Sequence, residues 1–144
     1  MADTEVEPVP FRILPRLTDL NRDFWTGGQV GELRFQRCQD CGYYNHPPSP
    51  LCPSCHSKHL AFEAVSGRAS LWTYTVNFQA WMPGPELPYI LAIVAFPEQE
   101  GLRLTTNLLD VAPEDLEIGM ALEVVFEPHD DEVWIPLFRP AVGA

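Results

Sequence analysis

The chain has 144 residues, 46% of them hydrophobic, which is the size of one ordinary domain or of a small module joined to a larger one. No apolar run approaches the roughly 20 residues that a membrane helix requires, and the acidic N-terminus lacks the pattern of a signal peptide. We therefore expect a soluble, cytoplasmic protein that does not enter a membrane. The formal net charge is −11, and residues 61–144 hold thirteen Asp/Glu but three Lys/Arg. Such a surface repels a phosphate backbone, which argues against nucleic acid as a partner.

Residues 1–30 are predicted to form an N-terminal arm and a short helix. The first dozen residues are acidic and rich in proline, so we expect them to be loose until they contact a partner or the body of the domain. A helix is predicted from Thr18, which can serve as its N-cap, to the Gly27-Gly28 pair, which should stop it. Trp25 lies beside the apolar face of this helix. It either docks on the rest of the chain or faces another subunit.

Residues 31–62 contain two Cys-x-x-Cys pairs, and the chain has no other cysteine. Cys38 and Cys41 form the first pair, and Cys52 and Cys55 form the second after a gap of ten residues. Four thiolates complete the closed tetrahedral shell of a structural zinc site, and a reducing compartment favours metal over disulfides. The spacing therefore predicts a rubredoxin-like zinc ribbon with no open coordination position. It also leaves no cysteine free for nucleophilic catalysis.

Residues 63–144 are predicted to form a five-stranded OB-fold barrel, so the fold as a whole is mainly β. Short apolar or alternating segments separated by Gly, Pro and acidic turns indicate strands, at 70–78, 89–96, 102–108, 121–126 and 133–138. The strand at 89–96 is almost continuously apolar, which is typical of a strand buried on both faces. One helical turn is predicted at 113–116, where an OB-fold often inserts a helix. Nine carboxylates and no Lys or Arg occur between Asp110 and Glu132, and we interpret them as a solvated acidic face.

The loop at residues 79–88 joins the first two predicted barrel strands and carries Trp81 and Met82. These side chains either fold back over the end of the barrel or contact another subunit or an acyl chain. Such a contact surface could extend to Trp25, Tyr43 and Tyr44.

Two rare cations of the acidic half, Arg68 and Arg139, could meet a CoA phosphate or a carboxylate of a partner. An internal ion pair is an equal alternative for both. None of the common catalytic motifs for hydrolases, metalloproteases or nucleotide-binding enzymes is present. We therefore predict no catalytic residues in this chain.

The sequence as a whole, over roughly residues 12–141, resembles a family of small proteins that was long catalogued as a domain of unknown function. The resemblance depends on several stretches in combination, including Asn21-Arg22-Asp23-Phe24-Trp25, Cys52-Pro53-x-Cys55 and Pro136-Leu137-Phe138-Arg139-Pro140. It implies an N-terminal helix, a zinc ribbon and an OB-fold. It also implies an accessory role beside thiolase-superfamily enzymes, with the closest likeness to the partners of steroid side-chain aldolases.

In such assemblies the partner carries the catalytic residues, and the accessory subunit stabilises it and borders the acyl-CoA channel. The hypothesis is therefore a non-catalytic subunit of a thiolase-like aldolase or acyltransferase that acts on acyl-CoA thioesters, with two copies of each chain. Two alternatives stay open. The chain could be a free-standing acyl-CoA-binding protein, or a module that binds single-stranded nucleic acid, which the acidic barrel disfavours.

Overall fold

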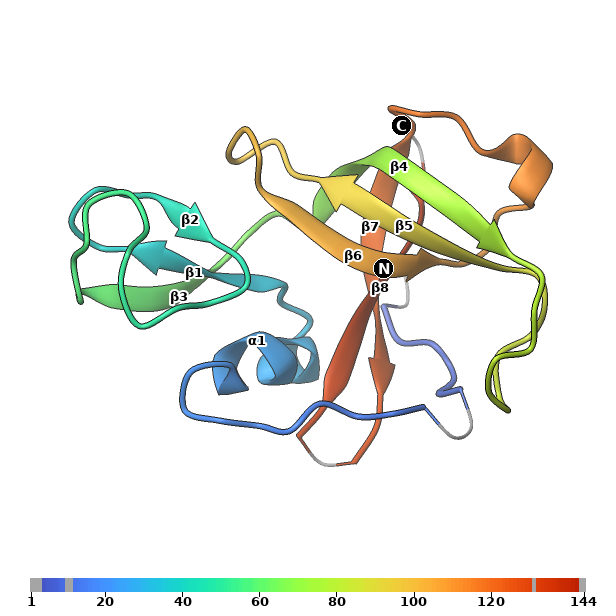
Figure 1. Ribbon diagram of the computed structural model, residues 1–144, viewed down its shortest axis with the longest axis horizontal. Coiled ribbons are helices and arrows are strands. Elements are labelled where there is room, and N and C mark those ends of the chain that lie inside the picture. Colours follow the sequence, from blue (N-terminus) through green and yellow to red (C-terminus); the bar gives the residue numbers. More distant parts are fainter. Residues whose placement is uncertain (1–3, 10–11, 131, 143–144) are drawn as a thin grey trace.

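The computed structural model describes residues 4–9, 12–130 and 132–142, and it shows a small three-stranded sheet beside a closed barrel (Figure 1). The elements in chain order are α1 (Arg22–Thr26), the 3₁₀ helix η1 (Gly27–Val30), β1 (Arg34–Cys38), β2 (Tyr44–Asn45), β3 (Leu60–Ala64), β4 (Arg68–Asn77), β5 (Tyr89–Ala95), β6 (Arg103–Leu108), the 3₁₀ helix η2 (Pro113–Asp115), β7 (Ala121–Pro128) and β8 (Trp134–Pro140). None of the helices in the described ranges is long and apolar enough to cross a membrane.

Strands β4 to β8 close into a barrel in the order β4-β5-β6-β8-β7, with β7 pairing back onto β4. All neighbours are antiparallel except β6 and β8, which run parallel where Leu108 faces Phe138. This arrangement confirms the predicted OB-fold, and η2 lies between β6 and β7 as expected.

One expectation about the barrel is wrong. Strand β5 was predicted to be buried on both faces, but its residues alternate. Ile90 and Val94 point into the core, whereas Leu91 is 42% exposed on the outer face.

The three-stranded sheet has the order β2-β1-β3 and holds the cysteine segment. Its central strand β1 pairs with β3 over its whole length, from Arg34 opposite Ala64 to Cys38 opposite Leu60. The buried Gln36 holds the proline-rich segment between the cysteine pairs in place. Its Nε2 donates to the Ser49 carbonyl at 2.9 Å, and its Oε1 accepts from the Ser49 N–H at 3.0 Å. A single amide side chain thus satisfies backbone groups that lie outside any strand.

The N-terminal helix differs from the prediction at both ends. Thr18 caps a turn that precedes the helix, because its Oγ1 accepts from the Asn21 N–H at 3.2 Å while its own N–H donates to Asn21 Oδ1 at 2.8 Å. The α-helix begins only at Arg22. Gly27 and Gly28 do not end the helical segment, which continues through them as η1. The segment ends at Gly31, whose φ of 73° lies in the left-handed region. Gly31, not the glycine pair, therefore supplies the helix stop.

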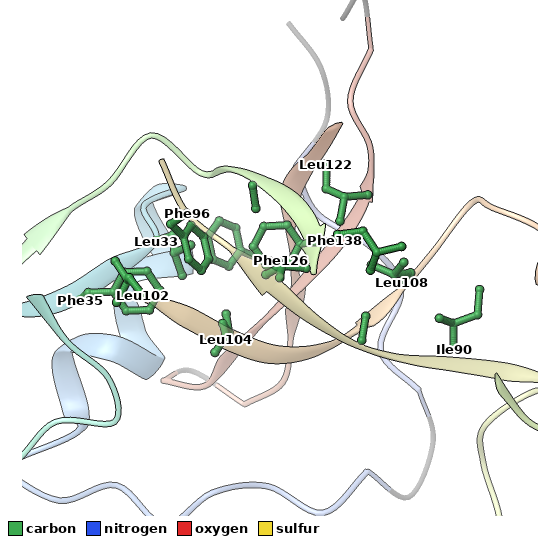
Figure 2. Packing of buried hydrophobic residues seen from close by; sticks show 14 of the residues in the cluster. Leu33, Phe35, Ile90, Phe96, Leu102, Leu104, Leu108, Leu122, Phe126 and Phe138 are labelled. Carbon is green, nitrogen blue, oxygen red and sulfur yellow. The ribbon is translucent and has the colours of Figure 1, made fainter. Parts of the chain in front are cut away.

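A single hydrophobic core runs from the ribbon into the barrel. Figure 2 shows Phe35 and Leu33 of the ribbon side packed next to Phe96 and Leu102, with Phe126 and Phe138 further into the barrel. The Phe35 and Phe96 rings meet edge to face at 4.9 Å between centroids, and Phe96 meets Phe138 at 5.9 Å. The ribbon and the barrel therefore share buried side chains.

We predict that Gly28→Ala destabilises the fold by about 1–3 kcal/mol. A Cβ at this position would lie 2.5 Å from Trp134 Cβ and 2.6 Å from Phe126 Cδ1, so β7, β8 or η1 must shift. Urea unfolding followed by tryptophan fluorescence measures the free energy of unfolding. The matched control is Gln29→Ala, the exposed next residue of η1. Equal stability of the two variants would contradict the close packing of η1 on the barrel.

Candidate functional site

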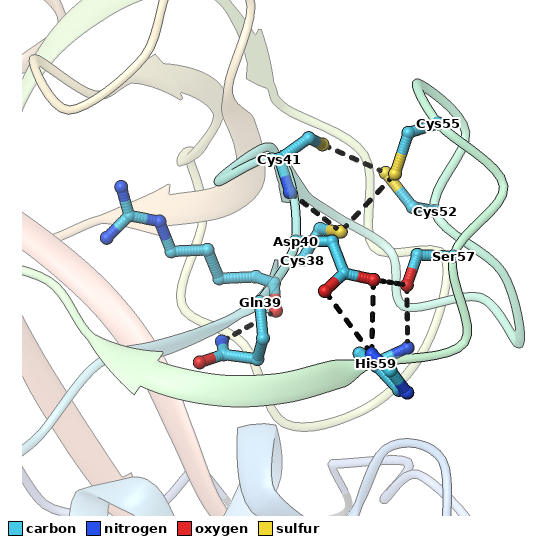
Figure 3. A network of polar contacts seen from close by, with 9 residues as sticks. Cys38, Gln39, Asp40, Cys41, Cys52, Cys55, Ser57 and His59 are labelled. Atoms are coloured by element: carbon cyan, nitrogen blue, oxygen red, sulfur yellow. Dashed lines mark hydrogen bonds and ion pairs between the residues drawn. The ribbon is translucent and has the colours of Figure 1, made fainter.

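The four cysteine sulfurs gather at one end of the ribbon, all within 4.8 Å of one another (Figure 3). Cys38 Sγ lies 3.6 Å from Cys55 Sγ, and Cys41 Sγ lies 3.6 Å from Cys52 Sγ. A tetrahedral zinc ion with bonds of about 2.3 Å places its sulfur ligands about 3.8 Å apart. The donor set and its spacing therefore fit a structural zinc ion, held by Cys38, Cys41, Cys52 and Cys55 as predicted.

The two cysteine pairs have matching backbone turns. The Gly42 N–H donates to the Cys38 carbonyl at 3.0 Å, and the His56 N–H donates to the Cys52 carbonyl at 2.9 Å. Both donors have positive φ, 82° at Gly42 and 65° at His56. The turns also aim backbone N–H groups at sulfur, from Cys41 to Cys38 Sγ and from Ser54 to Cys52 Sγ, each at 3.4 Å. Such contacts stabilise thiolates.

The pKa values of the thiols differ within the cluster, which affects how the cluster binds a metal. The Cys41 N–H is the main cause that lowers the pKa of Cys38 to about 6. The Ser57 N–H lowers the pKa of Cys55, but burial and the neighbouring thiols outweigh it and raise that pKa to about 12. Four negative sulfurs cannot share this space without a compensating cation. A divalent metal supplies that charge and binds all four as thiolates.

A polar cluster beside the sulfurs ties the two turns together. Asp40 accepts a hydrogen bond from the Ser57 hydroxyl, and its carboxylate lies 3.1 Å from His59 Nδ1 (Figure 3). The Ser57 hydroxyl, and then His59, hold the pKa of Asp40 below its usual value. Ser57 donates to the carboxylate and not to the imidazole, so the cluster lacks the hydrogen bond that activates a serine nucleophile. The cluster therefore has a structural role, because it links the turns of the two cysteine pairs.

The other predicted contact residues are not gathered in one place. Trp81 and Met82 lie in the loop between β4 and β5. Trp81 is 75% exposed, so its ring is not folded over the barrel end, whereas Met82 is 39% exposed. Tyr43 is also exposed. Tyr44 is only 8% exposed, and the Arg37 guanidinium lies 4.5 Å from the centre of its ring, so the expectation that Tyr44 extends an exposed surface is wrong. Trp25 is partly buried, with Phe24 edge to face against it.

The two predicted cations differ in their surroundings. Arg139 forms an ion pair with Glu123, its Nε 3.1 Å from the carboxylate, as the internal alternative anticipated. Arg68 is exposed at the start of β4 and forms no ion pair within the ranges that the structure describes. The sequence reasoning passed over a third cation, Arg103. Its guanidinium carbon lies 3.6 Å from the centre of the Trp72 ring.

A cavity of about 890 Å³ was not foreseen from the sequence. It lies between the N-terminal arm, α1, the His46–Pro48 turn and the outer faces of β5, β6 and β8, and Trp25, Trp72 and Arg103 line it. The N-terminal arm forms one wall of the cavity. It is held in place because Arg12 donates to the buried Glu127 from both Nε and a terminal nitrogen. The outward apolar residues of β5 were the available signal, and they were misassigned to a second buried face.

The buried Glu127 under the arm corrects one interpretation of the sequence. Glu127 belongs to the stretch that was interpreted as a solvated acidic face, yet it is 1% exposed. His129 lies beside it, with its Nε2 2.5 Å from Glu127 Oε1 and a side chain that is 11% exposed.

Comparisons with known proteins agree along the chain. Residues 25–62 match the family model of the ChsH2 rubredoxin-like zinc ribbon domain, and residues 62–127 match that of the ChsH2 C-terminal OB-fold domain. A solved structure of an Ltp2-ChsH2(DUF35) aldolase contains a chain that is 35% identical and superposes with a TM-score of 0.81, covering 90% of this chain and 100% of that one.

Curated relatives fall into two size classes. A probable enoyl-CoA hydratase alpha subunit of Thermomonospora curvata is 35% identical over 96% of this chain, but the chain spans only 43% of its length. A DUF35 domain-containing scaffold protein of Methanocaldococcus jannaschii is 38% identical over 67% of this chain and 72% of its own length. A subunit of benzoylsuccinyl-CoA thiolase from Thauera aromatica is a further relative.

We predict that the chain binds one zinc ion and that Cys38→Ser abolishes this binding together with the native fold. The serine hydroxyl is not a thiolate, so the shell opens and the ribbon loses the ion that closes it. Native mass spectrometry measures the zinc content, and circular dichroism measures the fold. Ser54→Ala is the control, because it keeps the backbone N–H that donates to Cys52 Sγ. A fully zinc-loaded Cys38→Ser protein would contradict the assignment.

Proposed function

The chain belongs to the DUF35 family of ChsH2-type proteins, which combine a rubredoxin-like zinc ribbon with an OB-fold, and we propose that it is a non-catalytic accessory subunit of a thiolase-like enzyme. The observation that carries the proposal is the agreement over 90% of the chain with the DUF35 chain of an Ltp2-ChsH2 aldolase. Relatives that are scaffold proteins or enzyme subunits support the same role.

The chemistry of the chain supports a structural use of zinc. Four thiolates fill a tetrahedral shell, so no coordination position remains for water or substrate. Zinc then acts by closing the ribbon, and the partner supplies the groups that react. The reaction would be aldol cleavage or acyl transfer on an acyl-CoA thioester, in the degradation of steroid side chains or of related lipids.

The β4–β5 loop is the part of the surface that fits a partner best. Phe78 is 72% exposed and Trp81 is 75% exposed, in a segment that three prolines stiffen. The Trp81 indole N–H donates to Asn77 Oδ1 at 3.0 Å, which holds the ring in one orientation. Large aromatic side chains that are already ordered lose little entropy on binding and commonly dominate an interface. An assembly of two copies of each chain follows if the partner is a dimer.

We predict that Trp81→Ala weakens assembly with the thiolase-like protein encoded beside this chain by about tenfold or more. Because the ring is exposed, the free energy of unfolding should change by less than about 0.5 kcal/mol. Co-expression, pull-down and mass analysis identify the partner, and calorimetry measures the affinity. Ile118→Ala is the matched control, an aliphatic side chain that is 63% exposed outside the loop.

Failure of the unaltered chain to co-purify with any thiolase-like protein would overturn the proposed function. Assembly that Trp81→Ala leaves unchanged would overturn only the role of the loop.

A further inference from the structure

The outer face of the barrel is unusually apolar beneath the N-terminal arm. Leu91 and Ile93 of β5 point outward there, next to Trp72 of β4. The pairing of β4 with β5 shifts register between Leu71 and Thr73, so Trp72 sits at a bulge. Bulges redirect side chains, and this one brings an aromatic ring to the outer face. The outer face of a small barrel is ordinarily polar where water covers it.

This face is part of a concave site and not of a flat patch. The arm, α1 and the His46–Pro48 turn border it and form a half-open cavity of about 890 Å³. In Figure 1 the arm runs below β5 and β6 toward α1. Pockets for small organic ligands have volumes of roughly 300–1,000 Å³, and the face formed by the second and third barrel strands is where OB-folds commonly bind ligands. Shape and place both favour a small molecule over a docked protein surface.

The charged residues around the cavity indicate the sign of the charge that a ligand would carry. Arg103 stacks on Trp72, and within the described residues it meets no carboxylate. A stacked guanidinium keeps its N–H edge free for a planar acceptor. Arg12 is already neutralised by Glu127. One cation is thus available, which matches a ligand with a single negative charge better than a phosphate with two.

The ring of His46 lines the ribbon side of the cavity. Its ring stacks on Phe24 at 4.7 Å, and its Nδ1 is buried with no hydrogen-bond partner. Burial lowers the pKa of His46 to about 4, so the ring is neutral at pH 7. A neutral ring adds no second positive charge to the lining of the cavity.

From these observations we propose that the cavity binds an apolar carboxylate, with its hydrocarbon body against Leu91 and Ile93 and its carboxylate on the free edge of Arg103. The body is an alkyl chain or a fused-ring system, since either fits apolar walls of this size. The ligand site is independent of the accessory role, because the isolated chain contains every residue that forms it.

Calorimetry on the zinc-loaded full chain tests the proposal with three probes below their critical micelle concentrations. Dodecanoate tests the alkyl body, cholate tests the fused rings, and dodecyltrimethylammonium carries the dodecyl chain with the opposite charge. We expect one carboxylate or both to bind with a stoichiometry of one, and the cation to bind at least tenfold more weakly. No carboxylate binding at millimolar concentration, or equal binding of the cation, would overturn the inference.

Two variants locate the site, and each has a control. Arg103→Gln should weaken carboxylate binding by about tenfold or more, because it removes a charge-assisted contact, whereas Arg68→Gln on the same barrel should not. Leu91→Asn should weaken binding of the same probe, whereas Ile118→Asn, at another exposed aliphatic residue, should not. Zinc content and circular dichroism confirm that the variants fold. Binding that neither Arg103→Gln nor Leu91→Asn alters would place the ligand elsewhere and overturn the proposal.

The outcomes are separable from those of the proposed function. A chain that assembles with a thiolase-like protein but binds no carboxylate refutes the ligand site alone. A chain that binds the carboxylate through Arg103 but assembles with no such protein refutes the accessory role alone.

Discussion

The contacts of Phe35 join the three parts of this protein. Its ring is fully buried, stacks on Phe24 of α1 at 6.1 Å, meets His46 of the ribbon at 5.2 Å and meets Phe96 of the barrel edge to face at 4.9 Å. Burial of one aromatic side chain removes about 150–250 Å² from water. Each neighbour contributes one side of the enclosure, so none of the three parts can move away without exposing this ring.

Zinc acts on the rest of the molecule through the segment between the cysteine pairs. The two turns fix both ends of that segment, and within it the Tyr44 backbone is bound to the barrel by Gln99, whose Oε1 accepts from the Tyr44 N–H at 2.9 Å while its Nε2 donates to the Tyr44 carbonyl at 2.8 Å. Two residues later, His46 forms a wall of the cavity. The metal is therefore structural in effect, yet it determines where a wall of the candidate ligand site stands.

The sequence predicted what local patterns encode. The Cys-x-x-Cys spacing indicated the zinc ribbon, and the strand patterns indicated the OB-fold, because both depend on neighbours in the chain. It did not predict the Trp72–Arg103 stack, since these side chains meet only when β4 and β6 flank β5 in the barrel. The same holds for Tyr44, whose burial depends on a glutamine 55 residues away. Contacts with residues distant in the sequence determine whether an aromatic residue is exposed. The hydrophobic periodicity of a segment does not reveal those contacts.

The buried Glu127 explains why the N-terminal arm belongs to the fold. The arm was expected to be loose until it met a partner or the body of the domain; residues 1–3 and 10–11 lie outside the described residues, and residues 4–6 and Arg12 contact β7. The Val6 N–H donates to the Phe126 carbonyl at 3.0 Å, and Arg12 pairs with Glu127 on the same strand. Removing one partner of a buried ion pair costs about 3–5 kcal/mol, because the other charge stays buried. Without Arg12 the buried Glu127 would keep His129 as a partner but lose the guanidinium that binds both of its oxygens. The acidic half of the chain therefore needs the arm, and the arm in turn forms one wall of the cavity.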